Sequence, residues 1–244
     1  MEARIIDISY RHKLSHIGSC LTTLPILDYI YKTKNPDDIV VLSSGHAGVA
    51  LYVVLEKYEN RDAEELLNKH GIHPGRDVVN GIHVSTGSLG QGVTIATGYA
   101  VGNPKRNVYC VLSDGECAEG SVWESLRFAH DKNLTNLKIH VNINGYSAYD
   151  AVDVLYLVRR LKSFWWRVNI WLTKAPYFKG LEAHYKPLKE EDLTNINAQG
   201  LRAYAVWGHE DQLAYIFDYC RSRLWDFGRY SARLSRSVYE RWLK

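Results

Sequence analysis

The sequence VYCVLSDGECAEGSVWE, residues 108–124, passes from an apolar run through a polar turn into a segment with helical spacing. The apolar run predicts a buried strand, and Asp114-Gly115 predicts the turn that follows it. The next predicted strand is followed in the same way by Asn144. In an open parallel sheet, ligands bind at the carboxyl ends of strands, beside helix N-termini that favour anions. Asp114 and Asn144 are therefore placed to hold one Mg²⁺ that carries a diphosphate, because Mg²⁺ takes few protein oxygens together with phosphate oxygens.

The rest of the chain alternates apolar runs with segments of helical periodicity. This alternation predicts a doubly wound α/β fold, with an open and mostly parallel sheet between layers of helices. The expected strands are 38–43, 107–112, 137–142 and 167–173, and the expected helices are 2–14, 23–33, 45–58, 62–70, 121–131 and 151–163. Residues 87–102 are expected to begin as a glycine-rich turn and to continue as a helix.

The bulk composition is that of a soluble globular protein. Of the 244 residues, 46% are hydrophobic and 23% are charged, and the formal net charge of +3 is too small to indicate nucleic-acid binding by itself. No apolar run has the length of a transmembrane helix, and the N-terminus lacks the apolar core of a signal peptide. The four cysteines have no CxxC spacing. They favour reduced thiols, and we expect a cytoplasmic protein that neither enters a membrane nor binds nucleic acid.

Five sequence blocks, taken in order, resemble the transketolase family, which uses thiamine diphosphate. They are HIGS at 16–19, SSGH at 43–46, STGSLGQG at 85–92, the Asp114 motif continued by EG at 119–120, WE at 123–124 and NL at 136–137, and HYKPL at 184–188. One block alone would be weak, whereas five in order are specific. The resemblance implies the thiamine-diphosphate-binding fold of the diphosphate-binding domain, with thiamine diphosphate and Mg²⁺ as cofactors.

The resemblance also implies which residues bind the metal and the cofactor. The metal ligands would be Asp114, Asn144 and the backbone carbonyl of Tyr146. The other cofactor-binding residues would be Gly115 and Glu116 of the Asp114 motif, Gly87, Ser88 and Leu89 on the pyrimidine side, and His46 and His184 near the diphosphate. Structural alternatives exist for each: a helix cap for Asp114, hydrogen-bonded histidines, and a flexible loop for the glycines.

Four further residues would take part in catalysis. His16 and His73 would lie near the sugar hydroxyls, with His70 as the alternative to His73. Glu119 and Glu124 would face the partner's glutamate across a dimer seam that also carries Trp123, a favoured interface residue. Solvated charges at a helix start are the alternative for the two glutamates.

Two departures from the family pattern concern the second half of the chain. Only forty residues (184 minus 144) separate Asn144 from His184, so we expect the sheet to be one β-α unit short. Nothing after residue 190 resembles the pyrimidine-binding domain. We therefore divide the chain into a diphosphate-binding domain, 1–192, and an aromatic helical tail, 193–244, that packs on the body or on a partner.

The expected function depends on the pyrimidine-binding domain, which the resemblance does not include. The chain is expected to be the N-terminal subunit of a split transketolase that transfers a two-carbon ketol unit between sugar phosphates. It would self-associate as a dimer and form a heterotetramer with a separately encoded pyrimidine-domain subunit. The alternatives are a subunit of a 1-deoxyxylulose-5-phosphate synthase-like enzyme, a non-catalytic scaffold that kept the fold, and nucleic-acid binding by the arginine-rich tail, which its interleaved acidic residues disfavour.

Overall fold

The structure is a computed structural model that describes residues 1–147, 150–165, 167–175, 186–199 and 204–208. The chain divides into two compact units, 1–207 and 208–244. Nearly all of the second unit lies outside the described residues, so the description below concerns the first.

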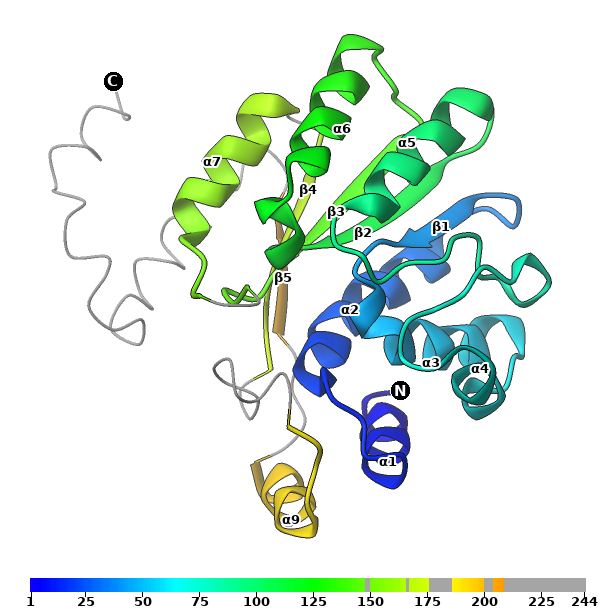
Figure 1. The fold of residues 1–244 in the computed structure, drawn as a ribbon, viewed down its shortest axis with the longest axis vertical. Coiled ribbons are helices and arrows are strands. Elements are labelled where there is room, and N and C mark those ends of the chain that lie inside the picture. Colours follow the sequence, from blue (N-terminus) through cyan, green and yellow to red (C-terminus); the bar gives the residue numbers. More distant parts are fainter. Residues whose placement is uncertain (148–149, 166, 176–185, 200–203, 209–244) are drawn as a thin grey trace, which may run out of the picture. The chain divides into compact units, whose positions relative to one another are not determined.

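A five-stranded sheet forms the centre of the first unit, with the strands in chain order (Figure 1). The strands are β1 (Ile39–Leu42), β2 (Val108–Ser113), β3 (Leu137–Ile143), β4 (Asn169–Lys174) and β5 (Tyr204–Gly208). The pairs β1–β2, β2–β3 and β3–β4 are parallel, with Ile39 opposite Val108 and Val108 opposite Leu137. Parallel pairing places the carboxyl ends of β1, β2 and β3 at one edge of the sheet.

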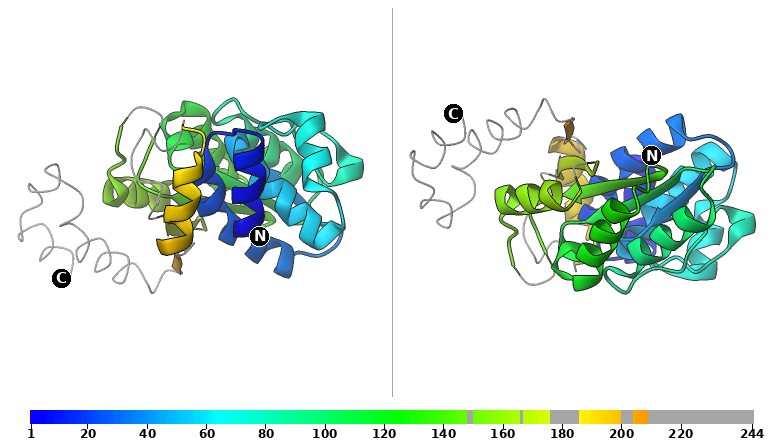
Figure 2. Two further views of the ribbon diagram at one scale, coloured as in Figure 1. Left: turned by 90° about the horizontal axis from the view of Figure 1, so that it is seen from below. Right: turned by 90° about the horizontal axis from the view of Figure 1, so that it is seen from above.

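Helices cover both faces of the sheet (Figure 2). One layer contains α1 (Glu2–Arg11), α2 (Ile17–Thr33), α3 (Gly48–Glu59) and α4 (Ala63–His70); the other contains α5 (Gln91–Gly102), α6 (Gly120–Asp131) and α7 (Val154–Phe164); α9 (Glu190–Gln199) follows β4. Val40, Leu42 and Val111 join the core formed with the first helical layer. Because side chains alternate across a strand, Val41 and Cys110 face the second layer.

Buried polar side chains attach α2 to the sheet. The Asn142 side-chain amide donates to the hydroxyls of Thr22 and Thr23, both at 3.1 Å, and its oxygen accepts from the hydroxyl of Thr173 on β4. Next to it, the Trp171 indole donates to Nδ1 of His140 at 2.9 Å. These satisfied contacts fix the position of α2, whose first turn follows His16.

The predicted fold class is confirmed, and the four predicted strands lie within two residues of their expected positions. Helix α2 begins at Ile17, six residues before the expected start. Little in the sequence indicates that residues 17–22 are helical, because α2 is buried on nearly every side and therefore has no polar stripe that would reveal its periodicity. The expected helix 45–58 consists of a short 3₁₀ turn, Gly45–Ala47, followed by α3.

The start of the expected tail differs from the prediction. Residue 192, the expected domain boundary, lies inside α9, and Ile196 of that helix is buried in the core beside the first helical layer. The segment 204–208, expected to be helical, is strand β5 and joins the edge of the sheet. The division at residue 192 stays a prediction, since residues 209–244 lie outside the described part, as does Cys220.

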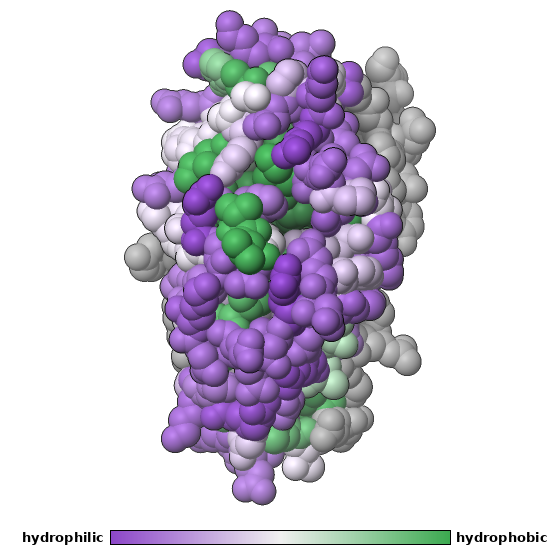
Figure 3. Space-filling view, turned by 90° about the vertical axis from the view of Figure 1, so that its right-hand side faces the viewer, coloured by the Kyte–Doolittle hydropathy of each residue, from purple (hydrophilic) through white to green (hydrophobic). Residues whose placement is uncertain are grey.

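The surface and the thiols of the described part are those of an ordinary globular domain. Figure 3 shows a face on which hydrophilic residues predominate around separate apolar patches. None of the described helices is both long enough and apolar enough to cross a membrane. Cys20, Cys110 and Cys117 are buried free thiols, and burial raises the pKa of each.

Candidate cofactor site

Asp114 connects the end of β2 to the loop that follows β3. Its Oδ1 accepts from the amide of Gly115 at 3.1 Å, and its Oδ2 accepts from the amide of Gly145 at 2.7 Å. The residue is 3% exposed, and burial raises the pKa of its carboxyl to about 7. No described residue forms a salt bridge with it. A bound cation would offset the cost of burying this charge.

Asn144 is held next to Asp114 by the same loop. Gly145, the residue after Asn144, donates the amide that binds Asp114. The Asn144 side-chain oxygen accepts from the amide of Tyr146 at 2.9 Å, and both residues are half-buried. One carboxylate and neutral oxygens at adjacent strand ends fit Mg²⁺ that brings phosphate oxygens of its own. Within the described residues, no group of three His, Cys, Asp or Glu side chains could hold a metal ion without such help.

The glycine-rich loop, residues 87–92, lies between the end of β1 and the start of α6. A Cβ on Gly92 would be 2.6 Å from the Cα of Ser43, and a Cβ on Gly90 would be 2.8 Å from the Cβ of Glu119. Gly90 also has a φ of +76°, which side chains rarely adopt. Larger residues at these two positions would separate the loop from the strand ends.

Three predicted histidines gather beside this loop. The rings of His16 and His46 have centroids 5.3 Å apart. A Cβ on Gly45, the neighbour of His46, would meet the carbonyl carbon of Thr86 at 2.5 Å, and a Cβ on Gly87 would meet the His73 ring at 2.9 Å. His16 and His46 are half-buried and His73 is exposed. Residues 86 and 87 therefore contact the His73 ring and the backbone next to His46, whose ring lies beside that of His16.

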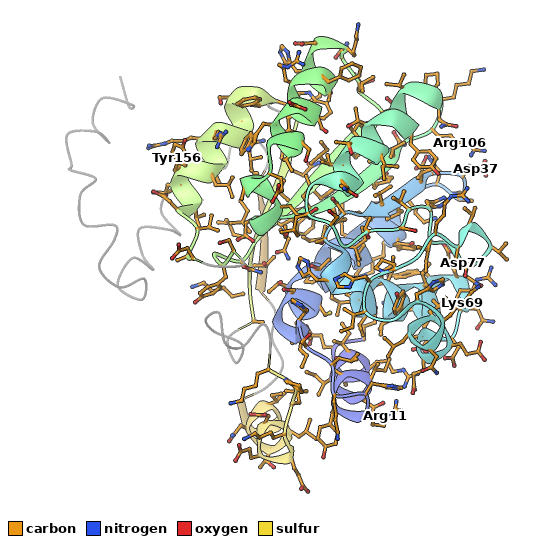
Figure 4. All side chains as sticks on the ribbon, viewed as in Figure 1. Arg11, Asp37, Lys69, Asp77, Arg106 and Tyr156 are labelled. Carbon is orange, nitrogen blue, oxygen red and sulfur yellow. The ribbon has the colours of Figure 1, made fainter. Side chains whose placement is uncertain are left out.

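The segment that carries His73 is anchored through Asp77. The Asp77 carboxylate accepts from Lys69 at 2.7 Å and from Asn80 at 2.8 Å, and it lies 3.2 Å from Nε2 of His70. Lys69 and Asp77 are next to one another in Figure 4. Of the two alternative histidines, His70 is thus held by Asp77, whereas His73 contacts the glycine-rich loop.

The remaining predicted residues have different surroundings. Glu119 and Glu124 are exposed at the start of α6, Ser88 is exposed, and Leu89 and Gly115 are half-buried. His184 lies outside the described residues. Trp123, whose place in a dimer seam stays a prediction, is buried within the chain, where its ring packs between Phe164, at 5.1 Å, and the guanidinium of Arg160, at 3.8 Å. Its indole also donates to the carbonyl of Cys117 at 2.9 Å.

Glu116, predicted to bind the cofactor, is fully buried and is bound on both oxygens by the protein itself. Oε1 accepts from the hydroxyl of Ser43 at 2.6 Å and from the amide of Gly90 at 3.1 Å, and Oε2 accepts from the amide of Ser113 at 3.0 Å. Burial raises the pKa of this carboxyl. Sequence reasoning missed Ser43 and Ser113 as its partners. The pattern S-x-x-E at Ser113–Glu116 could have indicated the contact, since Ser113 and Glu116 exchange hydrogen bonds as in a capping box.

Comparisons with known proteins agree on one family. Residues 7–171 match the family model described as "Transketolase, thiamine diphosphate binding domain". The chain is 34% identical over 179 residues to the transketolase of Pongo abelii, a match that covers 64% of this chain and 29% of that protein. It is 30% identical over 182 residues to one subunit of the apulose-4-phosphate transketolase of Phocaeicola vulgatus, a match that covers 66% of this chain and 64% of that relative.

A solved structure shows the same fold. The transketolase from Leishmania mexicana superposes with a TM-score of 0.64 at 20% identity, over 81% of this chain and 40% of that one. At this identity the likeness concerns the fold alone.

Proposed function

The chain belongs to the transketolase family, and we propose that it is the N-terminal, thiamine-diphosphate-binding subunit of a split transketolase. The observation that carries the proposal is the hydrogen bond between Asp114 and Gly145. It brings the carboxylate after β2 and Asn144 after β3 to one edge of the sheet, beside the glycine-rich loop. This arrangement suits a diphosphate held through Mg²⁺ at strand ends.

A separately encoded second subunit is supported by the name of one relative. The Phocaeicola vulgatus protein, of which the match covers 64%, is named as one subunit of a transketolase, and the match covers 29% of the Pongo abelii transketolase. We therefore assign the pyrimidine-binding half to a partner protein and the active site to the assembly of both. Glu119 and Glu124 are exposed, and we expect them to face that partner or a second copy of this chain.

We assign the following roles to the residues of the site. Asp114, Asn144 and the carbonyl of Tyr146 would hold Mg²⁺ and the diphosphate, with His46 and His184 close to it. The segment Gly87–Leu89 would bind the pyrimidine side of the cofactor. When bound, thiamine diphosphate supplies the nucleophilic carbon for two-carbon ketol transfer between sugar phosphates.

The histidines and glutamates would bind and transfer protons. His16 and His73 would hydrogen-bond the hydroxyls of the sugar and exchange protons with them, because imidazole titrates near neutral pH. Glu119 and Glu124 would share a proton with the partner's carboxylate across the seam between subunits.

Thermal melting tests the cofactor assignment. With millimolar thiamine diphosphate and MgCl₂, the wild-type chain should melt at a higher temperature, because a ligand that binds the folded state stabilises it. Asp114→Ala should remove this increase, and Asn144→Ala, which deletes a neutral oxygen, should reduce it. Asp38→Asn, at the opposite end of β1, should keep it. An undiminished increase in Asp114→Ala would refute the metal-and-diphosphate role.

A further inference from the structure

The first observation is that Glu116 binds three separate segments at once. Its carboxylate accepts from Ser43 at the end of β1, from Ser113 at the end of β2 and from Gly90 at the start of α5. Ser43 and Gly90 are 47 residues apart in sequence (90 minus 43), and Glu116 is 0% exposed. Two donors that are distant in sequence, Ser43 and Gly90, and one local donor, Ser113, thus converge on one buried carboxyl group.

The second observation concerns the start of α5. Gly90 occupies the N-cap position and has no side chain to accept from the helix. In a capping box, a Glu three residues inside the helix accepts from the N-cap amide, but Val93 occupies that position here. Glu116, from another part of the chain, accepts from the Gly90 amide instead. A negative charge at a helix N-terminus also interacts favourably with the helix dipole.

The third observation is the tight contact next to this bond. Gly92 lies against Ser43 so closely that a Cβ would be 2.6 Å from the Ser43 Cα. The Ser43 hydroxyl binds Glu116. Close packing thus holds the loop against the end of β1. The hydrogen bond from the Gly90 amide to Glu116 fixes the position of the loop at the start of α5.

We propose that Glu116 is a positioning residue that sets the glycine-rich loop, Gly87–Gly92, against the ends of β1 and β2 before any cofactor binds. This inference rests on the proposed function and reassigns Glu116 from contacting the cofactor to shaping the wall that does. Through Gly87 and Gly90, the same loop contacts His73 and Glu119. Displacing the loop therefore alters both sides of the site.

The test compares Glu116→Gln with Asp38→Asn in the full chain. Asp38 is a buried carboxylate at the other end of β1 that accepts from the amides of Asn35 and Asn107, so it is a matched control. A glutamine at position 116 has only one acceptor oxygen. Its NH₂ group must face the backbone amide of either Gly90 or Ser113, and because both amides are donors, one of these two hydrogen bonds is lost. Ser43→Ala keeps the carboxylate and both amide contacts, and its effect should be smaller.

The first measurement is amide hydrogen exchange of the cofactor-free chain, which does not depend on function. Exchange in residues 88–92 or 113–115 should become about tenfold faster in Glu116→Gln, the effect of one lost hydrogen bond. In Asp38→Asn both segments should exchange as in the wild type. Unchanged exchange in Glu116→Gln, or the same change in both variants, would overturn the inference.

The second measurement is the apparent affinity for thiamine diphosphate with Mg²⁺. It should fall about tenfold in Glu116→Gln and stay within twofold in Asp38→Asn. Faster loop exchange with unchanged affinity would contradict a positioning role. If the wild-type chain binds no cofactor with or without a partner, the proposed function fails, and the exchange result still decides whether Glu116 orders the loop.

Discussion

Two glycines of helix α5 should respond in opposite ways to the same substitution. At Gly92 an added Cβ would meet the Cα, Cβ and Oγ of Ser43 at 2.6–2.7 Å, closer than real Cβ contacts allow. At Gly98, also in α5, nothing lies within 4 Å. Gly92→Ala therefore forces the backbone of β1 and α5 apart, whereas Gly98→Ala adds only helix propensity.

The magnitudes follow from packing and propensity. Overpacking a closed contact costs about 1–3 kcal/mol, and replacing an exposed helical glycine with alanine stabilises by about 0.5–1 kcal/mol. The two variants should thus differ by roughly 1.5–4 kcal/mol in the free energy of unfolding.

Urea denaturation of the isolated chain measures this difference, with unchanged slopes as the check that compactness is preserved. Equal stabilities, or a Gly98→Ala variant less stable than Gly92→Ala, would refute the close approach of the glycine-rich loop to β1.

Two further predictions concern the polar groups between the sheet and α2. Burial lowers the pKa of His140 to about 3, so only the unfolded chain binds a proton at this imidazole as the pH falls below about 6.5. The free energy of unfolding of the wild type should therefore decline in that range, whereas that of His140→Gln lacks this contribution. In urea titrations, the stability deficit of His140→Gln relative to the wild type should shrink by about 2 kcal/mol between pH 8 and pH 5. A deficit that stays constant with pH would count against a neutral buried imidazole. Asn142→Leu leaves the hydroxyls of Thr22, Thr23 and Thr173 without this partner, and it should destabilise the chain by at least about 2 kcal/mol. A loss below about 0.5 kcal/mol would show that these contacts add little to stability.

The position of Asp114 and Asn144 at one edge of the sheet was predictable from sequence because the information is local. Asp114 and Asn144 each follow an apolar run, and parallel sheet topology places such residues at one edge. The hydrogen bond that joins their loops, from Gly145 to Asp114, agrees with that reasoning. The histidines were predictable only through the family resemblance, since contacts such as His73 with Gly87 depend on tertiary packing.

What the sequence did not predict depends on long-range packing. The partners of Glu116 were not predictable, because its burial depends on donors from Ser43 and Gly90 that are distant in sequence. The packing of Trp123 was not predictable either, because its neighbours Phe164 and Arg160 come from α7. Strand β5 was missed because an aromatic-rich segment fits a helix or an edge strand equally well until its neighbour in the sheet is known.

Titration of thiamine diphosphate in the presence of Mg²⁺ tests the central claim most directly, using this chain by itself, the proposed pyrimidine-domain partner by itself and their mixture. We predict weak binding by either protein in isolation, tight binding by the mixture, and two-carbon ketol transfer between sugar phosphates only in the mixture, because in the proposal each chain supplies one wall of the cofactor site. Full-affinity binding by this chain in isolation, or a mixture that binds no more tightly than its parts, would contradict the proposal of a split enzyme.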